Sequence, residues 1–143
     1  MRRRRIRAGA AVLLAAAVLV ACSGSGRGSS SSPTLPTTRP SSPAKLRILS
    51  PSNGQTVHGS SVNVRIELSG ARIVRAVTKD ITPTKGHLHV FLDDSLVSMN
   101  YGLSDRVHVK KPGTHVLRVE FVASDHLPFD PRVVANSAFE VKP

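Results

Sequence analysis

Polar and apolar residues alternate along most of the chain after residue 44. In residues 62–68, Val, Ile and Leu alternate with Asn, Arg and Glu, and in residues 114–122 the apolar Leu117, Val119 and Phe121 alternate with charged side chains. Successive side chains of a strand point to opposite faces of a sheet, so this pattern predicts strands with one buried and one solvated face. Apolar residues at helical spacing are not sustained over three turns anywhere in this region. We therefore predict an all-β domain.

Turn-forming residues separate the predicted strands, most clearly at residues 50–54 and 110–113, which are rich in Pro, Gly, Ser and Asn. The predicted strands are residues 46–48, 62–68, 72–77, 87–92, 96–101, 106–109, 114–122 and 133–141. About seven or eight short strands with closely spaced turns predict an immunoglobulin-like or fibronectin-III-like β-sandwich over residues 45–143. A small Greek-key barrel is the alternative.

The N-terminal segment has the features of a secretory signal. Five arginines lie within the first seven residues, and an apolar run follows from Ala8 to Val20. This run is shorter than the roughly 20 apolar residues that span a bilayer and fits the roughly 7 to 15 of a signal peptide. The run ends in Leu-Val-Ala-Cys, which resembles the bacterial lipobox. That resemblance implies cleavage after residue 21 and lipid modification of Cys22, the only cysteine of the chain.

An ordinary signal peptide with a chance cysteine, or an uncleaved anchor, is the alternative interpretation. We predict a lipoprotein signal peptide over residues 1–21, and a lipidated Cys22 with a disordered linker over residues 22–44. Residues 23–44 are almost wholly Ser, Gly, Pro, Thr and Arg, a composition that forms no core. Two or three acyl chains make anchoring stable. The domain is therefore expected on the extracytoplasmic face of the cell membrane, held there by its lipid.

The net charge of +11 gives a misleading first impression of a nucleic-acid-binding protein. Arginines of the signal segment supply much of it, and residues 45–143 carry 13 basic and 9 acidic side chains, a difference of +4. Single-stranded nucleic acids are bound by basic grooves with aromatic side chains on which bases stack, and this chain has four Phe, one Tyr and no Trp. The composition argues against a nucleic-acid partner and suits residence beside an anionic membrane.

The stretch GHLHVFLDD carries two histidines in an otherwise strand-like run. Alternation turns Leu88, Val90 and Leu92 toward the core, which places His87 and His89 together on the outer face, in contact with water. Neutral imidazoles are ligands for copper and zinc. The alternative is that both histidines are solvent-facing residues or packing partners for a loop.

Two further residues are candidates to complete such a metal site. Met99 lies on the next predicted strand, and its thioether is a ligand that suits copper. His126 lies in the loop SDHLPFDP, where it is either a third imidazole ligand or part of a rigid connection. His115 falls on the inner face of its strand, which predicts a hydrogen-bonded structural histidine.

Three stretches resemble secreted bacterial Ig-like domains, namely SPSNGQTVHGSSVNVRIEL, PGTHVLRVEF, and GHLHVFLDD with the later DHLPFDP. The last pair resembles small lipoproteins and domains of unknown function with a G-H-x-H strand. The resemblance implies an extracytoplasmic β-sandwich and assigns no activity.

Sequence motifs of catalysis are missing. The chain has no G-x-S-x-G, no H-E-x-x-H and no phosphate-binding glycine loop, so we predict no enzyme. The predicted function is a binding or accessory module without a cofactor, whose partner is an envelope protein or polymer that contacts Phe91, Tyr101 and Phe129. The alternative is a lipoprotein that binds copper or zinc through His87 and His89.

Overall fold

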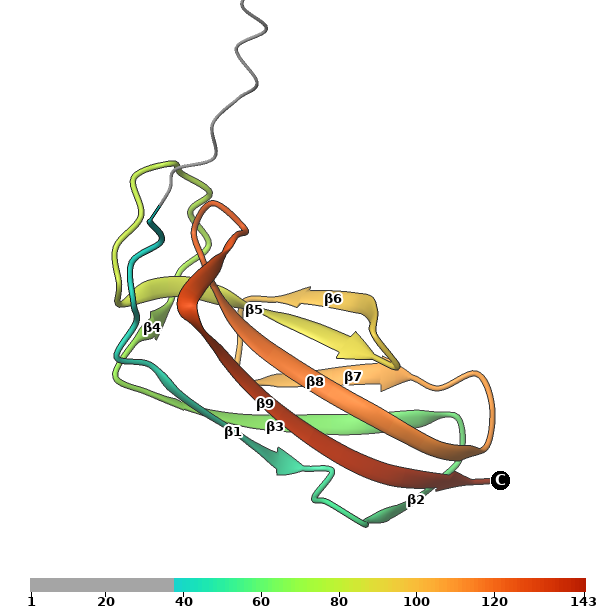
Figure 1. Ribbon diagram of the computed structural model, residues 1–143. Coiled ribbons are helices and arrows are strands. Elements are labelled where there is room, and N and C mark those ends of the chain that lie inside the picture. The colour runs from blue at the N-terminus through green and yellow to red at the C-terminus, as the bar shows by residue number, and fades with distance from the viewer. Residues whose placement is uncertain (1–37) are drawn as a thin grey trace, which may run out of the picture. The chain divides into compact units, whose positions relative to one another are not determined.

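The computed structural model describes residues 38–143, and this part of the chain contains strands, turns and loops but no helix (Figure 1). The prediction of an all-β domain is confirmed. The predicted signal peptide, Cys22 and the linker as far as residue 37 lie outside the described residues. Within residues 38–143, nothing has the helical length and apolarity needed to cross a membrane.

In the described part of the chain, nine strands form two sheets that face each other as a β-sandwich (Figure 1). The smaller sheet has the order β1-β3-β7, with β1 at Lys45–Ser50, β3 at Ser61–Ser69 and β7 at Ser104–His108. The larger sheet has the order β2-β9-β8-β5-β4, with β2 at Thr56–His58, β9 at Pro128–Lys142, β8 at Gly113–Ala123, β5 at Lys85–Leu92 and β4 at Arg72–Ile73. The strand β6 (Ser95–Asn100) also pairs with β5.

The core lies between the two sheets and is built from alternate residues of their strands. It comprises Val62, Val64 and Ile66 of β3, Leu88 and Val90 of β5, Leu117, Val119 and Phe121 of β8, and Phe139 and Val141 of β9, with others around them. The predicted inward set of β5 is confirmed, since Leu88 and Val90 are fully buried and Leu92 nearly so. Each such side chain contributes about 1.5 to 3 kcal/mol through burial.

Two strands differ from their predicted bounds by more than two residues, and one strand was not predicted. β4 covers only Arg72–Ile73 instead of residues 72–77. The reason is that β4 and β6 pair with the same edge of β5. β4 pairs with Lys85 and Gly86, and β6 occupies the edge from Leu88 to Leu92, so β4 has no further partner there. β9 begins at Pro128, earlier than the predicted residue 133, and the three-residue β2 was missed.

The folded unit begins earlier than the predicted boundary at Lys45. Arg39 forms hydrogen bonds with the loop between β8 and β9, and the Pro40 carbonyl accepts a hydrogen bond from the Asp130 amide at 3.1 Å. Ser42 donates a hydrogen bond to the Pro83 carbonyl at 2.6 Å. The prediction of a disordered linker up to residue 44 is therefore wrong for its last residues, because their backbone and side chains have partners in the domain.

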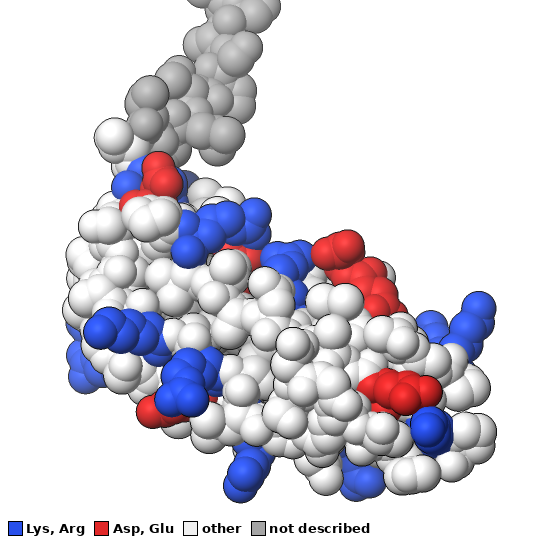
Figure 2. Space-filling model, turned by 60° about the horizontal axis from the view of Figure 1, so that its bottom comes forward, with Lys and Arg blue, Asp and Glu red and all other residues white. Residues whose placement is uncertain are grey.

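Charged side chains of both signs are scattered over the face shown in Figure 2, with no continuous basic patch on it.

The carboxylate of Glu120 on β8 is buried, since the residue is 1% exposed. Arg132 donates two hydrogen bonds to its carboxylate at 2.7 and 2.6 Å, and Arg118 lies 3.4 Å from it. This carboxylate is fully engaged by arginines, which is how a buried charge is tolerated.

Candidate metal centre

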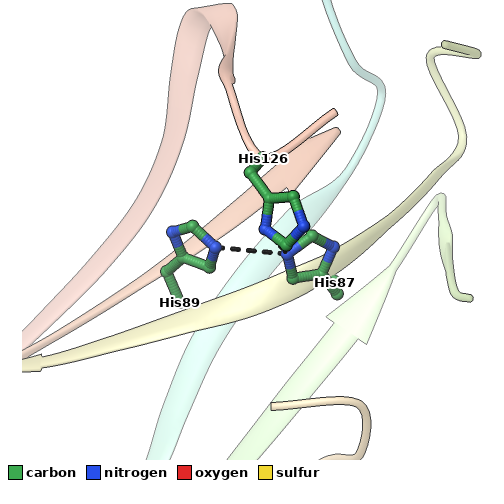
Figure 3. A group of neighbouring side chains, drawn as sticks. All are labelled: His87, His89 and His126. Atoms are coloured by element: carbon green, nitrogen blue, oxygen red, sulfur yellow. Dashed lines mark hydrogen bonds between the residues drawn. The ribbon is translucent and has the colours of Figure 1, made fainter. Parts of the chain in front are cut away.

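Three histidines meet on the outer face of the larger sheet, at the end of β5 where the chain enters it (Figure 3). His87 and His89 project from β5, and His126 reaches over them from the loop between β8 and β9. His87 Nε2 lies 3.1 Å from His89 Nε2 and 3.0 Å from His126 Nδ1. One nitrogen from each ring lies within 4.8 Å of the other two, so the three form a possible metal-binding group. We call His87, His89 and His126 the histidine triad.

Local backbone geometry explains why His87 and His89 stand where they do. They are two apart on one strand, which puts both on the same face. Gly86, immediately before them, lies where β5 and β8 approach each other so closely that a Cβ at this position would overlap the Val122 carbonyl oxygen. The glycine of the G-H-x-H stretch is thus a packing requirement beside the triad.

His126 is held by a tight turn. Its φ angle is +66°, in the left-handed region, which histidine adopts more readily than bulky or β-branched residues do. The His126 amide donates to the Ala123 carbonyl at 3.0 Å, and the Ala123 amide donates to the Leu127 carbonyl at 3.0 Å. These bonds close the turn and direct the imidazole toward β5.

Burial favours the neutral form of His87 and His89. His87 is 0% exposed and His89 is 9% exposed. Burial, and after it the neighbouring His126 and His89, lower the pKa of His87 to about 4. Burial and His126 also lower the pKa of His89, with Glu120 opposing them. At neutral pH both rings are therefore neutral, and each keeps a nitrogen lone pair that can bind a metal.

Neutral imidazoles in this arrangement cannot meet all of one another's hydrogen-bonding requirements. The Nε2 of His87 has either one proton or one lone pair, yet it faces two other ring nitrogens, so one of the two contacts lacks a full hydrogen bond of its own. The second nitrogen of His87, Nδ1, is buried and has no partner among the described residues. A buried polar group without a partner costs about 1 to 3 kcal/mol. The triad therefore contributes little to the stability of the fold. This favours a role in binding a ligand.

Aromatic and charged side chains surround the triad. The Tyr101 ring lies 5.1 Å from the His87 ring between centroids, and the Arg75 guanidinium lies 5.4 Å from the Tyr101 centroid. Glu120 is opposite His89 in the pairing of β5 with β8. Because Arg132 and Arg118 engage that carboxylate, the nitrogens of the triad are the donors that this site offers.

Met99 is opposite His89 in the antiparallel pairing of β5 with β6. Directly opposed residues have Cβ atoms about 4.5 to 5.5 Å apart and project on the same face of the sheet. Met99 is 51% exposed, so its thioether has room to change rotamer. The structure thus brings together the three histidines that the sequence singled out and places Met99 beside one of them.

Two predictions about this surface are wrong. His87 and His89 do lie on the outer face, but His87 is sealed from water and His89 nearly so, because the His126 loop and Tyr101 cover this end of β5. Phe129 is not available to a partner, since it is 1% exposed and its ring stacks on Phe121 at 5.5 Å. 

The rest of the proposed partner surface is only partly exposed. Phe91 lies under the Arg118 guanidinium at 3.8 Å, and Tyr101 packs against His87. The prediction that His115 is a structural histidine agrees with its hydrogen bonds to the Asp93 carboxylate at 2.6 Å and to the Lys111 carbonyl at 2.9 Å.

Sequence reasoning missed two residues whose contacts lie close to the triad. Arg39 and Gly86 are both needed for contacts between segments far apart in the chain. The only signal for Gly86 was its place directly before the two histidines, and Arg39 gave none because it lies in a segment of linker-like composition.

No protein-family model and no curated protein matches this chain. Among solved structures, it is similar to the fibronectin(III)-like modules of Clostridium thermocellum CbhA, with a TM-score of 0.44 and 14% sequence identity over 68% of this chain and 94% of that one. It is also similar to an engineered protein, with a TM-score of 0.47 and 11% identity over 70% of this chain and 20% of that one. Both similarities concern the β-sandwich fold alone.

Proposed function

We propose that the domain binds one copper or zinc ion through the histidine triad, while a lipid on Cys22 holds it at the extracytoplasmic face of the cell membrane. The observation that carries the metal site is the convergence of three ring nitrogens within 4.8 Å in a buried position. The membrane location is supported by the signal-like segment and the lipobox resemblance at residues 19–22.

The spacing of the nitrogens suits a single ion. Metal–nitrogen bonds of about 2.0 to 2.1 Å place two ligands of a tetrahedral site roughly 3.3 Å apart. The two separations that involve His87, 3.1 and 3.0 Å, need only a few tenths of an ångström of expansion to fit, and the nitrogens of His89 and His126 lie within 4.8 Å of each other. A central cation would also give the facing lone pairs the partner that they lack in the metal-free arrangement.

The donor set favours copper when Met99 takes part. Imidazole suits both zinc and copper, whereas a thioether is a soft ligand that selects Cu(I). The buried carboxylate of Glu120 nearby is engaged by two arginines. We therefore propose binding of the ion, without catalysis, as the role of this surface.

The test is a metal titration of the full chain in detergent, using Cu(I) and Zn(II) in competition with a chromophoric chelator. We expect one equivalent to bind tightly to the natural chain and to be lost in a His87→Ala/His89→Ala variant. The matched control is His108→Ala, which removes an exposed histidine of β7 outside the triad. Absence of bound metal in the natural chain, or equal loss in the control variant, would overturn the proposal.

A further inference from the structure

The three ligands of the proposed site are held in different ways. His87 and His89 belong to β5, which pairs with strands on both of its edges. His126 lies in the loop between β8 and β9, outside any strand. Two ligands two residues apart on a strand make only a weak site, and a structural or catalytic zinc site has at least three protein ligands. Whatever holds the His126 loop therefore controls the affinity of the site.

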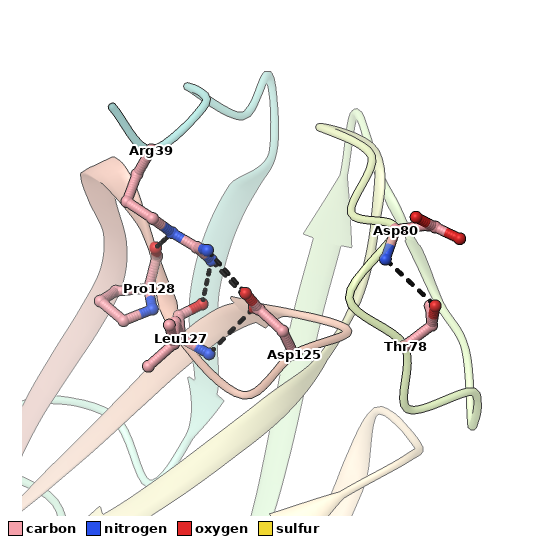
Figure 4. A network of polar contacts seen from close by, with 6 residues as sticks. All are labelled: Arg39, Thr78, Asp80, Asp125, Leu127 and Pro128. Atoms are coloured by element: carbon pink, nitrogen blue, oxygen red, sulfur yellow. Dashed lines mark hydrogen bonds and ion pairs between the residues drawn. The ribbon is translucent and has the colours of Figure 1, made fainter. Parts of the chain in front are cut away.

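Arg39 holds that loop (Figure 4). Its guanidinium forms a two-pronged pair with the Asp125 carboxylate, with Nη1 donating to Oδ2 at 2.6 Å and Nη2 donating to Oδ1 at 2.9 Å. The same side chain donates from Nε to the Pro128 carbonyl at 2.8 Å and from Nη2 to the Leu127 carbonyl at 3.1 Å. These contacts lie on both sides of His126 in the sequence.

The ion pair is largely shielded from solvent. The side chains of Arg39 and Asp125 are 16% and 17% exposed. Asp125 in turn accepts a hydrogen bond from the Leu127 amide at 3.2 Å, which links the pair to the turn that presents His126. A two-pronged arginine–carboxylate pair fixes orientation as well as distance, because the planar guanidinium matches the carboxylate geometry.

Arg39 also stands at a special place in the chain. It belongs to the segment that leads from the predicted anchor at Cys22 into the domain, and it is followed by Pro40, whose carbonyl accepts a hydrogen bond from the Asp130 amide at 3.1 Å. Residues 39 and 40 thus form a clamp that joins the start of the folded unit to the loop carrying the third ligand. The pair joins residues 86 positions apart in the sequence.

We propose that Arg39 is a positioning residue for the metal site, which holds His126 over β5 through Asp125 and the Leu127 and Pro128 carbonyls. This inference rests on the proposed metal-binding function. When the clamp is absent, the His126 loop is no longer held over β5. The site then has only the two ligands of β5, His87 and His89, in fixed positions. The affinity for Cu(I) or Zn(II) then decreases although no ligand has been removed.

The experiment compares Cu(I) and Zn(II) affinity of the full chain in detergent with that of Arg39→Ala and Arg39→Lys. Loss of partners that orient a ligand typically weakens metal binding about 10- to 100-fold, and we expect Arg39→Ala to fall in this range. Arg39→Lys should be intermediate, because lysine supplies the charge without the two-pronged geometry. The control is Arg47→Ala, whose arginine is 74% exposed and pairs with Glu67 at 3.4 Å on β3, in the opposite sheet.

A double-mutant cycle separates positioning from a general effect on the fold. In a His126→Ala background, Arg39→Ala should cause no further loss of affinity, since the ligand that it positions is gone. Electron paramagnetic resonance of the Cu(II)-loaded chain gives a second readout, with three coupled nitrogens expected in the natural chain and two in Arg39→Ala. A purely structural role of the ion pair would produce neither the dependence on His126 in the double-mutant cycle nor the change in the number of coupled nitrogens.

The outcomes are distinct for the two proposals. If the natural chain binds metal through the triad and Arg39→Ala binds it with unchanged affinity, the positioning role is wrong and metal binding stands. If Arg39→Ala weakens binding equally with and without His126, the clamp acts on the fold and the positioning role is again wrong. If the natural chain binds neither ion, both proposals are wrong.

Discussion

Gly86 provides the sharpest test of how the fold supports the triad. A Cβ added at this position would overlap the Val122 carbonyl oxygen and come within 3.0 Å of Cζ of the Phe121 ring. The first neighbour is backbone of the adjacent strand, so it is unable to move aside by a rotamer change. The two strands must separate instead, at a point where Gly86 pairs with Ala123 and His87 with Val122.

Overpacking of a well-packed interior costs about 1 to 3 kcal/mol, and a clash with backbone belongs at the upper end of that range. We expect Gly86→Ala to lower the free energy of unfolding by about 2 to 3 kcal/mol. For a domain of this size each kilocalorie shifts the midpoint of thermal unfolding by about 4 to 8 °C, so the melting temperature should fall by at least about 8 °C. The adjacent His87 should move with its strand, which also weakens metal binding.

The assay is urea and thermal unfolding followed by circular dichroism, in the absence of metal. Gly102→Ala is the matched control, because a Cβ at that position has only the Asn100 side-chain oxygen near it, at 3.5 Å. An unfolding free energy of Gly86→Ala equal to that of Gly102→Ala would refute the close approach of β5 and β8.

Three further predictions concern the anchor, the metal and pH. Cys22→Ser should move the protein from the membrane fraction to the soluble fraction, and a variant that stays with the membrane would contradict lipid anchoring. Met99→Leu should lower Cu(I) affinity while leaving Zn(II) affinity within about twofold, and an equal effect on both ions would exclude the thioether as a copper ligand. The hydrogen bond that His115 donates to the Asp93 carboxylate raises the pKa of His115 above 6.5 despite partial burial, so the stability it contributes is complete below pH 6.5 and is lost as pH rises through the raised value. Thermal unfolding between about pH 6 and pH 9 should therefore show a steeper loss of stability in the natural chain than in His115→Gln, and parallel profiles would contradict this linkage.

The strands and the inner face of β5 were predictable because they depend on local alternation. The period of two at Leu88, Val90 and Leu92 determines which side chains turn inward, and the burial of these residues follows from it. The same period determines that His87 and His89 share the other face. It contains no information on what covers that face.

The covering of the triad depends on contacts between distant segments. The Thr78 amide donates to the Ser124 carbonyl at 3.2 Å, and Arg39 pairs with Asp125, and neither contact leaves a local pattern in the sequence. This is why the two rings were expected to meet water and instead lie beneath a loop.

The start of β9 was missed for a different reason. Proline interrupts a strand prediction, and Pro128 and Pro131 both fall before residue 133. Pro131 is tolerated because it lies within an irregularity of the pairing, between Val122 opposite Pro128 and Phe121 opposite Val133. The parallel partner β2 reaches only the far end of β9, so this part of β9 is also a sheet edge.

The three imidazoles of the proposed metal site are supported unequally, and this would determine the route by which an ion reaches it. On one side lies β5, whose inward residues are locked into the hydrophobic core and allow no opening there. On the other side lies a single turn, held by the Arg39 side chain and by the hydrogen bond from the Thr78 amide to the Ser124 carbonyl. An ion in the proposed metal site would therefore enter and leave past His126, and how often that turn lifts away would set the rate of exchange.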